Sequence, residues 1–112
     1  MTRPFALFEL SDLQARQRRI GEAYYEFLRV PALNVGLYVL PAGSADRQTP
    51  HDEDEVYYVV SGLGVFSVEG ADRTVQEGSI LYVKAGVDHR FHSITKDLTV
   101  LVFFSAMPQA AV

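Results

Sequence analysis

Residues 49–60 read Thr-Pro-His-Asp-Glu-Asp-Glu-Val-Tyr-Tyr-Val-Val, an acidic segment that runs directly into an apolar one. The β-branched and aromatic residues 56–60 favour a strand. Side chains alternate between the two faces of a strand, so Asp52 and Asp54 point away from the other acidic residues if the entry is extended. The shared face then carries Thr49, His51, Glu53, Glu55 and Tyr57. The segment predicts an imidazole and carboxylates directed at one point, although an acidic run by itself is more typical of a solvated loop.

Similar apolar runs recur along the chain, separated by turn residues such as Pro41-Ala-Gly43, Ser61-Gly62 and Thr95-Lys-Asp97. The expected strands are residues 33–40, 55–60, 63–69, 73–77, 79–83, 90–94 and 98–104. Seven short strands within about seventy residues predict an all-β fold, either a sandwich or a barrel.

The N-terminal part predicts one short helix, residues 12–17, with Ser11 as its N-cap and its end before Arg18, Arg19 and Gly21. Residues 23–29 are slightly more typical of a strand, because they are rich in aromatic residues and Val30-Pro31 follows. Their aromatic side chains have two open interpretations, an arm on a partner subunit or a cover over one end of the chain's own barrel. These side chains are Tyr24, Tyr25 and Phe27.

Length and composition restrict the classes of protein. A chain of 112 residues fits one domain, with an N-terminal arm at 1–32 and a barrel core at 33–105. The net charge of −4 has the wrong sign for binding nucleic acid or an anionic membrane. No apolar run predicts a membrane span or a secretion signal, so we expect a cytoplasmic protein. The absence of cysteine leaves three histidines, carboxylates and neutral oxygens as metal ligands.

Two of the expected strands, residues 56–60 and 98–104, are apolar on both faces. A strand that is buried on one face only would alternate apolar with polar residues. Something must therefore cover the outer face as well, and a second subunit is the simplest cover. We expect a homodimer.

A second histidine segment runs from Gly78 through a turn to His92. The period of two places His89 and Phe91 on one face of a strand and His92 on the other. At most one of these two histidines should therefore enter the barrel.

The spacings Gly43-(x7)-His51-(x3)-Glu55-(x6)-Gly62 and Gly78-(x7)-Gly86-(x2)-His89 resemble the two motifs of the cupin superfamily. The resemblance spans roughly residues 33–104 and implies a double-stranded β-helix. The family's motif has a further histidine where this chain has Thr49, a proline at Lys84 and an asparagine at Ser93.

The resemblance implies that His51, Glu55 and His89 hold a divalent metal. Two imidazoles and a carboxylate are the ligand set of non-haem iron oxygenases, and they also suit manganese, zinc or nickel. Thr49, or Gln48, is the expected weak fourth contact. The competing interpretation is a site that has lost its metal together with the missing histidine.

These residues predict a metal-dependent enzyme for a small molecule that chelates the ion through oxygens. Iron would favour a dioxygenase reaction, and zinc or manganese an isomerisation. Tyr57 is the candidate proton donor, and Phe66, Tyr82 and Phe91 are the expected pocket walls. The alternatives are a module that binds a small molecule or metal without turnover, and a structural dimer with incidental histidines.

Overall fold

The computed structural model describes residues 4–47 and 50–105, and in these ranges it contains one helix and six strands. Every strand pairing is antiparallel, which confirms the all-β prediction. The elements are α1 (Leu10–Ile20), β1 (Tyr24–Val30), β2 (Leu33–Leu40), β3 (Glu55–Val68), β4 (Ala71–Gln76), β5 (Ile80–Val83) and β6 (His89–Ser105).

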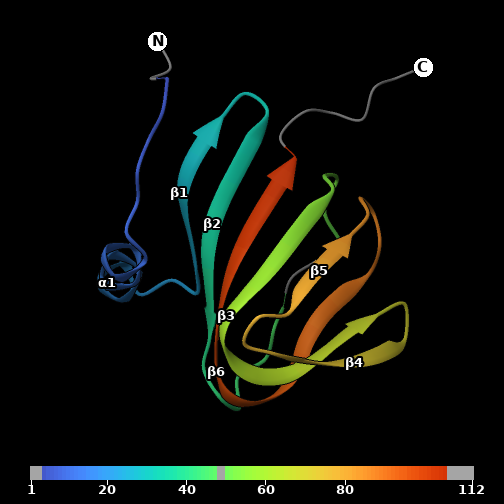
Figure 1. Ribbon diagram of the computed structural model, residues 1–112. Coiled ribbons are helices and arrows are strands. Elements are labelled where there is room, and N and C mark those ends of the chain that lie inside the picture. The colour runs from blue at the N-terminus through green and yellow to red at the C-terminus, as the bar shows by residue number, and fades with distance from the viewer. Residues whose placement is uncertain (1–3, 48–49, 106–112) are drawn as a thin grey trace, which may run out of the picture.

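The strands form one sheet in the order β1-β2-β6-β3-β4, with β5 paired to β3. The long strands β3 and β6 run side by side and bend, so that the sheet curves around its own inner face (Figure 1). The core on this face contains Tyr57, Val59, Phe66, Phe91, Leu98, Val100 and Val102, among others. The fold therefore brings the start of β3 close to the end of β5 and the start of β6.

The turns predicted at Ser61-Gly62 and Thr95-Lys-Asp97 are wrong, because β3 and β6 each continue through them. The register between the two strands shifts in this region instead. Gly62 has φ +109°, and a Cβ on it would lie 2.3 Å from the carbonyl oxygen of Asp97. Glycine is required here so that the two strands can pass closely as they bend.

Helix α1 begins at Leu10 with Glu9 as its N-cap, so the predicted start at Ser11 is wrong. The helix also continues to Ile20, because Arg18 and Arg19 fit its last turn, where cations interact favourably with the helix dipole. Gly21 ends it in a left-handed conformation. In the described part of the chain, no helix is long and apolar enough to cross a membrane.

The strand predicted at 23–29 is confirmed as β1, which pairs with β2 of the same chain. The ring of Tyr24 packs edge-on against Tyr38 and Phe104, with centroid distances of 6.1 and 6.3 Å. Tyr24 therefore covers its own barrel. Phe27 instead contacts Phe8, which belongs to the segment before α1.

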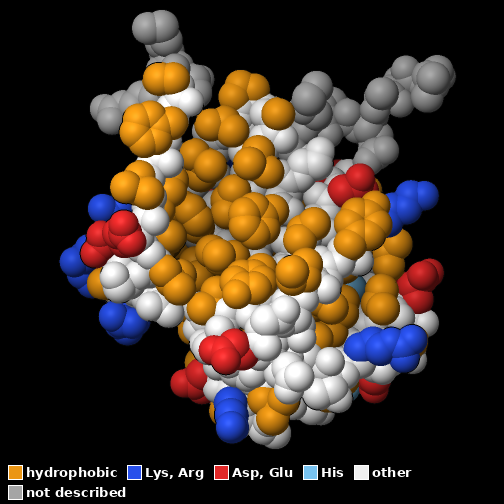
Figure 2. All heavy atoms as spheres, viewed as in Figure 1, with side chains coloured by type: hydrophobic (Ala, Val, Ile, Leu, Met, Phe, Trp, Pro, Cys, Tyr) orange, Lys and Arg blue, Asp and Glu red, His pale blue; other side chains and the backbone are white. Residues whose placement is uncertain are grey.

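The outer face of β1, β2 and β6 carries a second apolar surface. Residues 4–13 cover part of it and leave an apolar groove of about 640 Å³. Figure 2 shows the hydrophobic side chains gathered across this face of the molecule. The groove is lined by residues that include Phe5, Phe8, Phe27, Leu33, Leu101 and Phe103.

Candidate metal centre

One loop and the starts of two strands bring His51, Glu55 and His89 together. Glu55 opens β3, His89 opens β6, and His51 lies in the loop before β3. The backbone N–H of Gly86 donates to the carbonyl of His51 at 2.7 Å, which ties that loop to the β5–β6 turn. One potential ligand atom from each of the three residues lies within 4.8 Å of the others. The predicted cluster is therefore present in the fold.

The imidazole of His89 is held in an orientation that suits a metal ligand. Its Nδ1 lies 2.7 Å from the carbonyl of Val87 and donates to it, so Nε2 faces Glu55. Metal-binding histidines commonly use one ring nitrogen in this way to fix the other. His89 is buried, whereas His92 is part-exposed and contacts Asp72 at 3.1 Å. As expected, only one of the two histidines enters the barrel.

Glu55 is the member of the cluster whose surroundings best fit a metal ligand. Its side chain is 1% exposed, and Oε1 lies 2.6 Å from Nε2 of His89. Beyond this contact, neither carboxyl oxygen has a hydrogen-bond partner among the described residues. Buried carboxylates are normally paired fully or coordinate a metal. Two imidazoles and a carboxylate with unused lone pairs fit a divalent transition metal.

The pKa of His89 results from opposing effects. Burial lowers it, but the hydrogen bonds that the imidazole donates to Glu55 and to the Val87 carbonyl, together with the charge of Glu55, raise it above its ordinary value. In the protein without metal, Glu55 and the Val87 carbonyl therefore favour a proton on His89. A metal ion would take the place of that proton.

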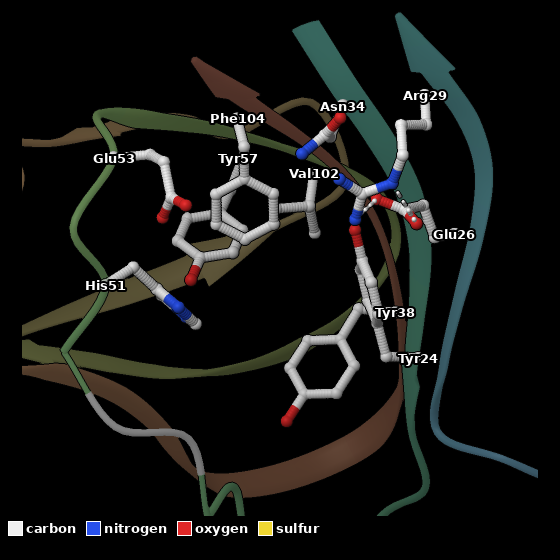
Figure 3. A pocket seen from close by; sticks show the side chains of 10 residues that line it. All are labelled: Tyr24, Glu26, Arg29, Asn34, Tyr38, His51, Glu53, Tyr57, Val102 and Phe104. Atoms are coloured by element: carbon white, nitrogen blue, oxygen red, sulfur yellow. Dashed lines mark hydrogen bonds and ion pairs between the residues drawn. The ribbon is translucent and has the colours of Figure 1, made fainter. Parts of the chain in front are cut away.

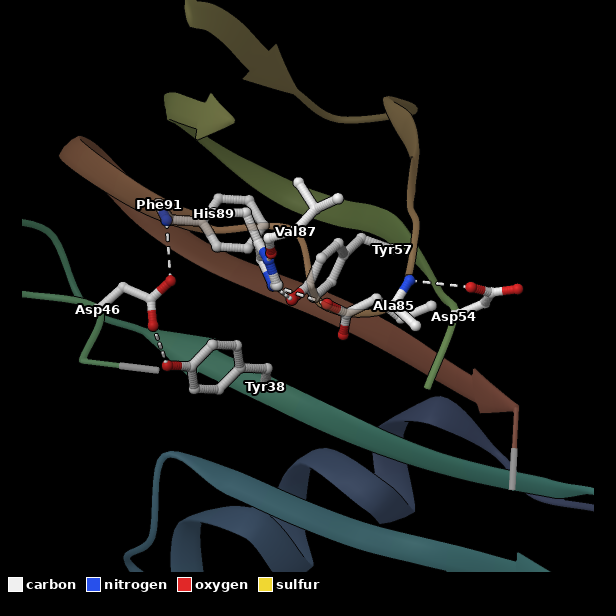
Figure 4. A network of polar contacts seen from close by, with 9 residues as sticks. Tyr38, Asp46, Asp54, Tyr57, Ala85, Val87, His89 and Phe91 are labelled. Carbon is white, nitrogen blue, oxygen red and sulfur yellow. Dashed lines mark hydrogen bonds and ion pairs between the residues drawn. The ribbon is translucent and has the colours of Figure 1, made fainter. Parts of the chain in front are cut away.

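Residues that the sequence did not single out hold the surrounding loops (Figure 4). Asp46 is buried and accepts hydrogen bonds from the hydroxyl of Tyr38 at 2.5 Å and from the backbone N–H of Phe91 at 2.8 Å. Asp54 accepts from the N–H of Ala85 at 2.9 Å. Nothing in the local sequence distinguishes these two aspartates from solvated ones, because their backbone partners, Ala85 and Phe91, lie 31 and 45 residues away.

Tyr57 points into the barrel beside the cluster. Its side chain is 1% exposed, and its hydroxyl lies 3.0 Å from Nε2 of His89. The ring packs edge-on against Phe66 and Phe91. The hydroxyl therefore adjoins the three candidate ligands.

The predicted pocket walls have different locations. Phe66 and Phe91 are buried in the core beneath Tyr57 and His89. Tyr82 is 65% exposed, so its assignment to the pocket is wrong. Leu81, which pairs with Tyr57, and Val83 have the less exposed positions of β5, and the alternation along the strand turns Tyr82 outward. The expected fourth contacts, Gln48 and Thr49, lie outside the described residues.

A cavity of about 370 Å³ opens beside His51 and Tyr57 (Figure 3). Sequence reasoning missed most of its walls, because β1 and β2 reach it only through the curvature of the sheet. Its lining residues are Tyr24, Glu26, Arg29, Asn34, Tyr38, His51, Glu53, Tyr57, Val102 and Phe104.

Comparison with known proteins identifies the family that this chain resembles. The model of the cupin domain family matches residues 36–104. The chain is 49% identical to an uncharacterised protein of Streptomyces coelicolor, over 88% of this chain and 93% of that protein. It is 27% identical to acireductone dioxygenase 2 of Arabidopsis thaliana, over 71% of this chain but only 44% of that protein.

A solved structure shares the fold. An RmlC-like cupin family protein of Methanocaldococcus jannaschii, described as having a double-stranded β-helix fold, superposes with a TM-score of 0.68. The two are 18% identical, and the match covers 73% of this chain and 77% of the other. The predicted double-stranded β-helix is thereby confirmed, and the chain belongs to the cupin family.

Proposed function

We propose that this chain binds one divalent transition-metal ion, iron, manganese, zinc or nickel, through His51, Glu55 and His89. The observation that carries the proposal is the buried, incompletely paired carboxyl group of Glu55 between two imidazoles. His51 lines the cavity, so the cluster lies beside the pocket. A small molecule would therefore reach the ion from that side.

The proposed substrate is a small molecule that chelates the ion through two oxygens. The ion would supply positive charge that stabilises negative charge developing on those oxygens. Tyr57, whose hydroxyl adjoins His89, would donate a hydrogen bond or a proton to the bound molecule. Val102 and Phe104 supply the apolar wall that limits access of water.

A dioxygenase reaction is the first class to test, because one relative is named acireductone dioxygenase 2. Isomerisation is the second class, and the position of Tyr57 beside the cluster favours it as a proton-transfer reaction. A module that binds without turnover would retain ligand affinity but show neither reaction.

Elemental analysis tests the metal site directly. Protein purified without added metal or chelator is expected to contain about one equivalent of metal, which Glu55→Gln and His89→Ala should lose. His92→Ala is the matched control, since His92 lies on the other face of β6 and pairs with Asp72. Its metal content should equal that of the parent.

Two results would contradict the proposed metal site. If the parent protein holds no metal after anaerobic reconstitution with iron, manganese, zinc and nickel in turn, the proposed function is wrong. Retention of metal by both Glu55→Gln and His89→Ala would place the ion elsewhere.

We propose further that the chain forms a homodimer through the outer face of β1, β2 and β6. The apolar groove on that face supports this arrangement, since exposed apolar patches of this kind commonly mark interfaces.

A further inference from the structure

The pocket has a second polar end, away from the candidate metal ligands. It is formed by Tyr24, Glu26 and Arg29 on β1 and by Asn34 on β2. Figure 3 shows the guanidinium group of Arg29 beside the hydroxyl of Tyr24 and the amide of Asn34, with His51 on the far side of the pocket. A ligand that reaches the metal cluster can therefore extend toward these three side chains.

Glu26 fixes the orientation of Arg29. The Nε and Nη2 atoms of Arg29 donate to the two carboxyl oxygens of Glu26, at 3.2 and 3.0 Å. A guanidinium group has five N–H donors, so the remaining ones are available on its other sides. An exposed ion pair of this kind adds little to stability. We therefore interpret the contact with Glu26 as one that positions the guanidinium group of Arg29 at the pocket.

Tyr24 adds a buried donor to this end of the pocket. Its hydroxyl has no hydrogen-bond partner among the described residues, and neither has Oδ1 of Asn34. Burial, followed by the charges of Glu26 and Glu55, raises the pKa of Tyr24 to about 12. The hydroxyl therefore keeps its proton at neutral pH and is able to donate it in a hydrogen bond.

Gly36 allows Tyr24 to take this position. A Cβ on Gly36 would lie 2.2 Å from both Cζ and the hydroxyl oxygen of Tyr24. The tip of the ring thus rests directly on the backbone of β2. Any side chain at residue 36 would push the hydroxyl away from Arg29.

From this arrangement we infer that Arg29 and Tyr24 form a subsite for a carboxylate, so that the substrate is a metal-chelating acid with a second carboxylate at its far end. The chelating half of this statement rests on the proposed function. The guanidinium and phenol groups supply donors suited to a planar anion, whereas the unpaired Oδ1 of Asn34 is an acceptor and takes no part in holding it. A phosphate fits less well, because Glu26 offsets the charge of Arg29 and Glu53 also lines the pocket.

Two probes of equal chain length isolate the subsite. Both 2-oxoglutarate and 2-oxopentanoate have the same chelating end, but only the first has a distal carboxylate. Calorimetric titration of the metal-loaded protein should show at least about tenfold tighter binding of 2-oxoglutarate, as expected for hydrogen bonds to a charged group. Arg29→Met should remove this difference and leave the affinity for 2-oxopentanoate unchanged.

Matched variants separate the subsite from general effects. Tyr24→Phe should weaken binding of 2-oxoglutarate several-fold, whereas Tyr25→Phe, one residue along β1, should not. Arg18→Met removes a positive charge from α1 and should leave both affinities as they are in the parent. A loss of preference in Arg18→Met would show that net charge, and not the subsite, causes it.

Equal binding of the two probes, or no binding of either, would overturn the subsite even in protein that holds its metal. The same titrations in metal-free protein distinguish this failure from failure of the metal site. A preference for 2-oxoglutarate that Arg29→Met abolishes, in a protein that takes up no metal, would support the subsite and overturn the proposed metal function.

Discussion

The contact between His89 and Glu55 makes the candidate metal centre sensitive to pH. The imidazole of His89 and the carboxyl group of Glu55 lie 2.6 Å apart in a buried environment, and each is fixed by its position at the start of a strand. Because the pair holds the pKa of His89 above its ordinary value, a proton and a metal ion compete for the same nitrogen. The occupancy of the site should therefore depend on pH.

We expect metal affinity to decrease as the pH falls from about 8 to 5, because both imidazoles must be neutral to coordinate. Competition titrations with a chromogenic chelator would measure this decrease. Metal content that stays constant after prolonged dialysis at about pH 5 would contradict a histidine-based site.

The protein without metal should show the opposite dependence. A group whose pKa is raised by folding stabilises the protein below its unfolded pKa of about 6.5, and this contribution is lost as the pH rises through the folded value. Thermal unfolding of chelator-treated protein across this range would show it. Glu55→Gln, which lacks the charged partner, should show a smaller dependence.

Among the elements, the crossing of β3 and β6 determines the shape of the barrel. Both strands bend where their register shifts, and Gly62 lies at this point. The backbone of Asp97 and Leu98 approaches so closely that a Cβ on residue 62 would lie 2.3 and 2.7 Å from atoms of those residues. The backbone on both sides belongs to long strands, so it has little freedom to move away.

Gly62→Ala should destabilise the fold by about 2 to 4 kcal/mol, through strain at positive φ together with the steric clash. Gly78→Ala is the control, because Gly78 has φ +90° but open space around its Cβ position. It should lose only about 1 kcal/mol. Equal losses measured by chemical denaturation would show that the close approach of β6 contributes nothing.

The whole molecule has two unlike faces. The inner face of the curved sheet encloses the core and the candidate metal centre, whereas the outer face of β1, β2 and β6 remains apolar. Leu33 lies in the outer groove and is 37% exposed. On the basis of the proposed homodimer, this residue should become buried in the assembly.

Light scattering after size exclusion should give twice the chain mass of 12.5 kDa at micromolar concentration. Leu33→Lys should shift the protein toward the monomer, since it would bury an unpaired charge in the interface. Ile80→Lys, at a 70% exposed position on β5, should leave the dimer intact. A parent protein that elutes as a monomer would contradict the proposal.

The sequence by itself determined the strand composition and the local chemistry. Alternation along residues 55–57, the start of β3, correctly directed Glu55 and Tyr57 inward, because the period of a strand is a local property of the backbone, whereas His51 lies in a loop to which this period does not apply. The same period separated His89 from His92. The spacing of glycines and histidines also indicated the cupin family, which the match over residues 36–104 confirms.

Only the tertiary structure decided which distant segments meet. Asp46 and Arg29 carry no local signal, since their contacts and positions depend on the curvature that brings β1, β2 and the loop after β2 over the inner face. The turn at Ser61-Gly62 was mispredicted for a related reason. Glycine there serves the close passage of β6, and a contact between residues 35 positions apart cannot be read from the local pattern.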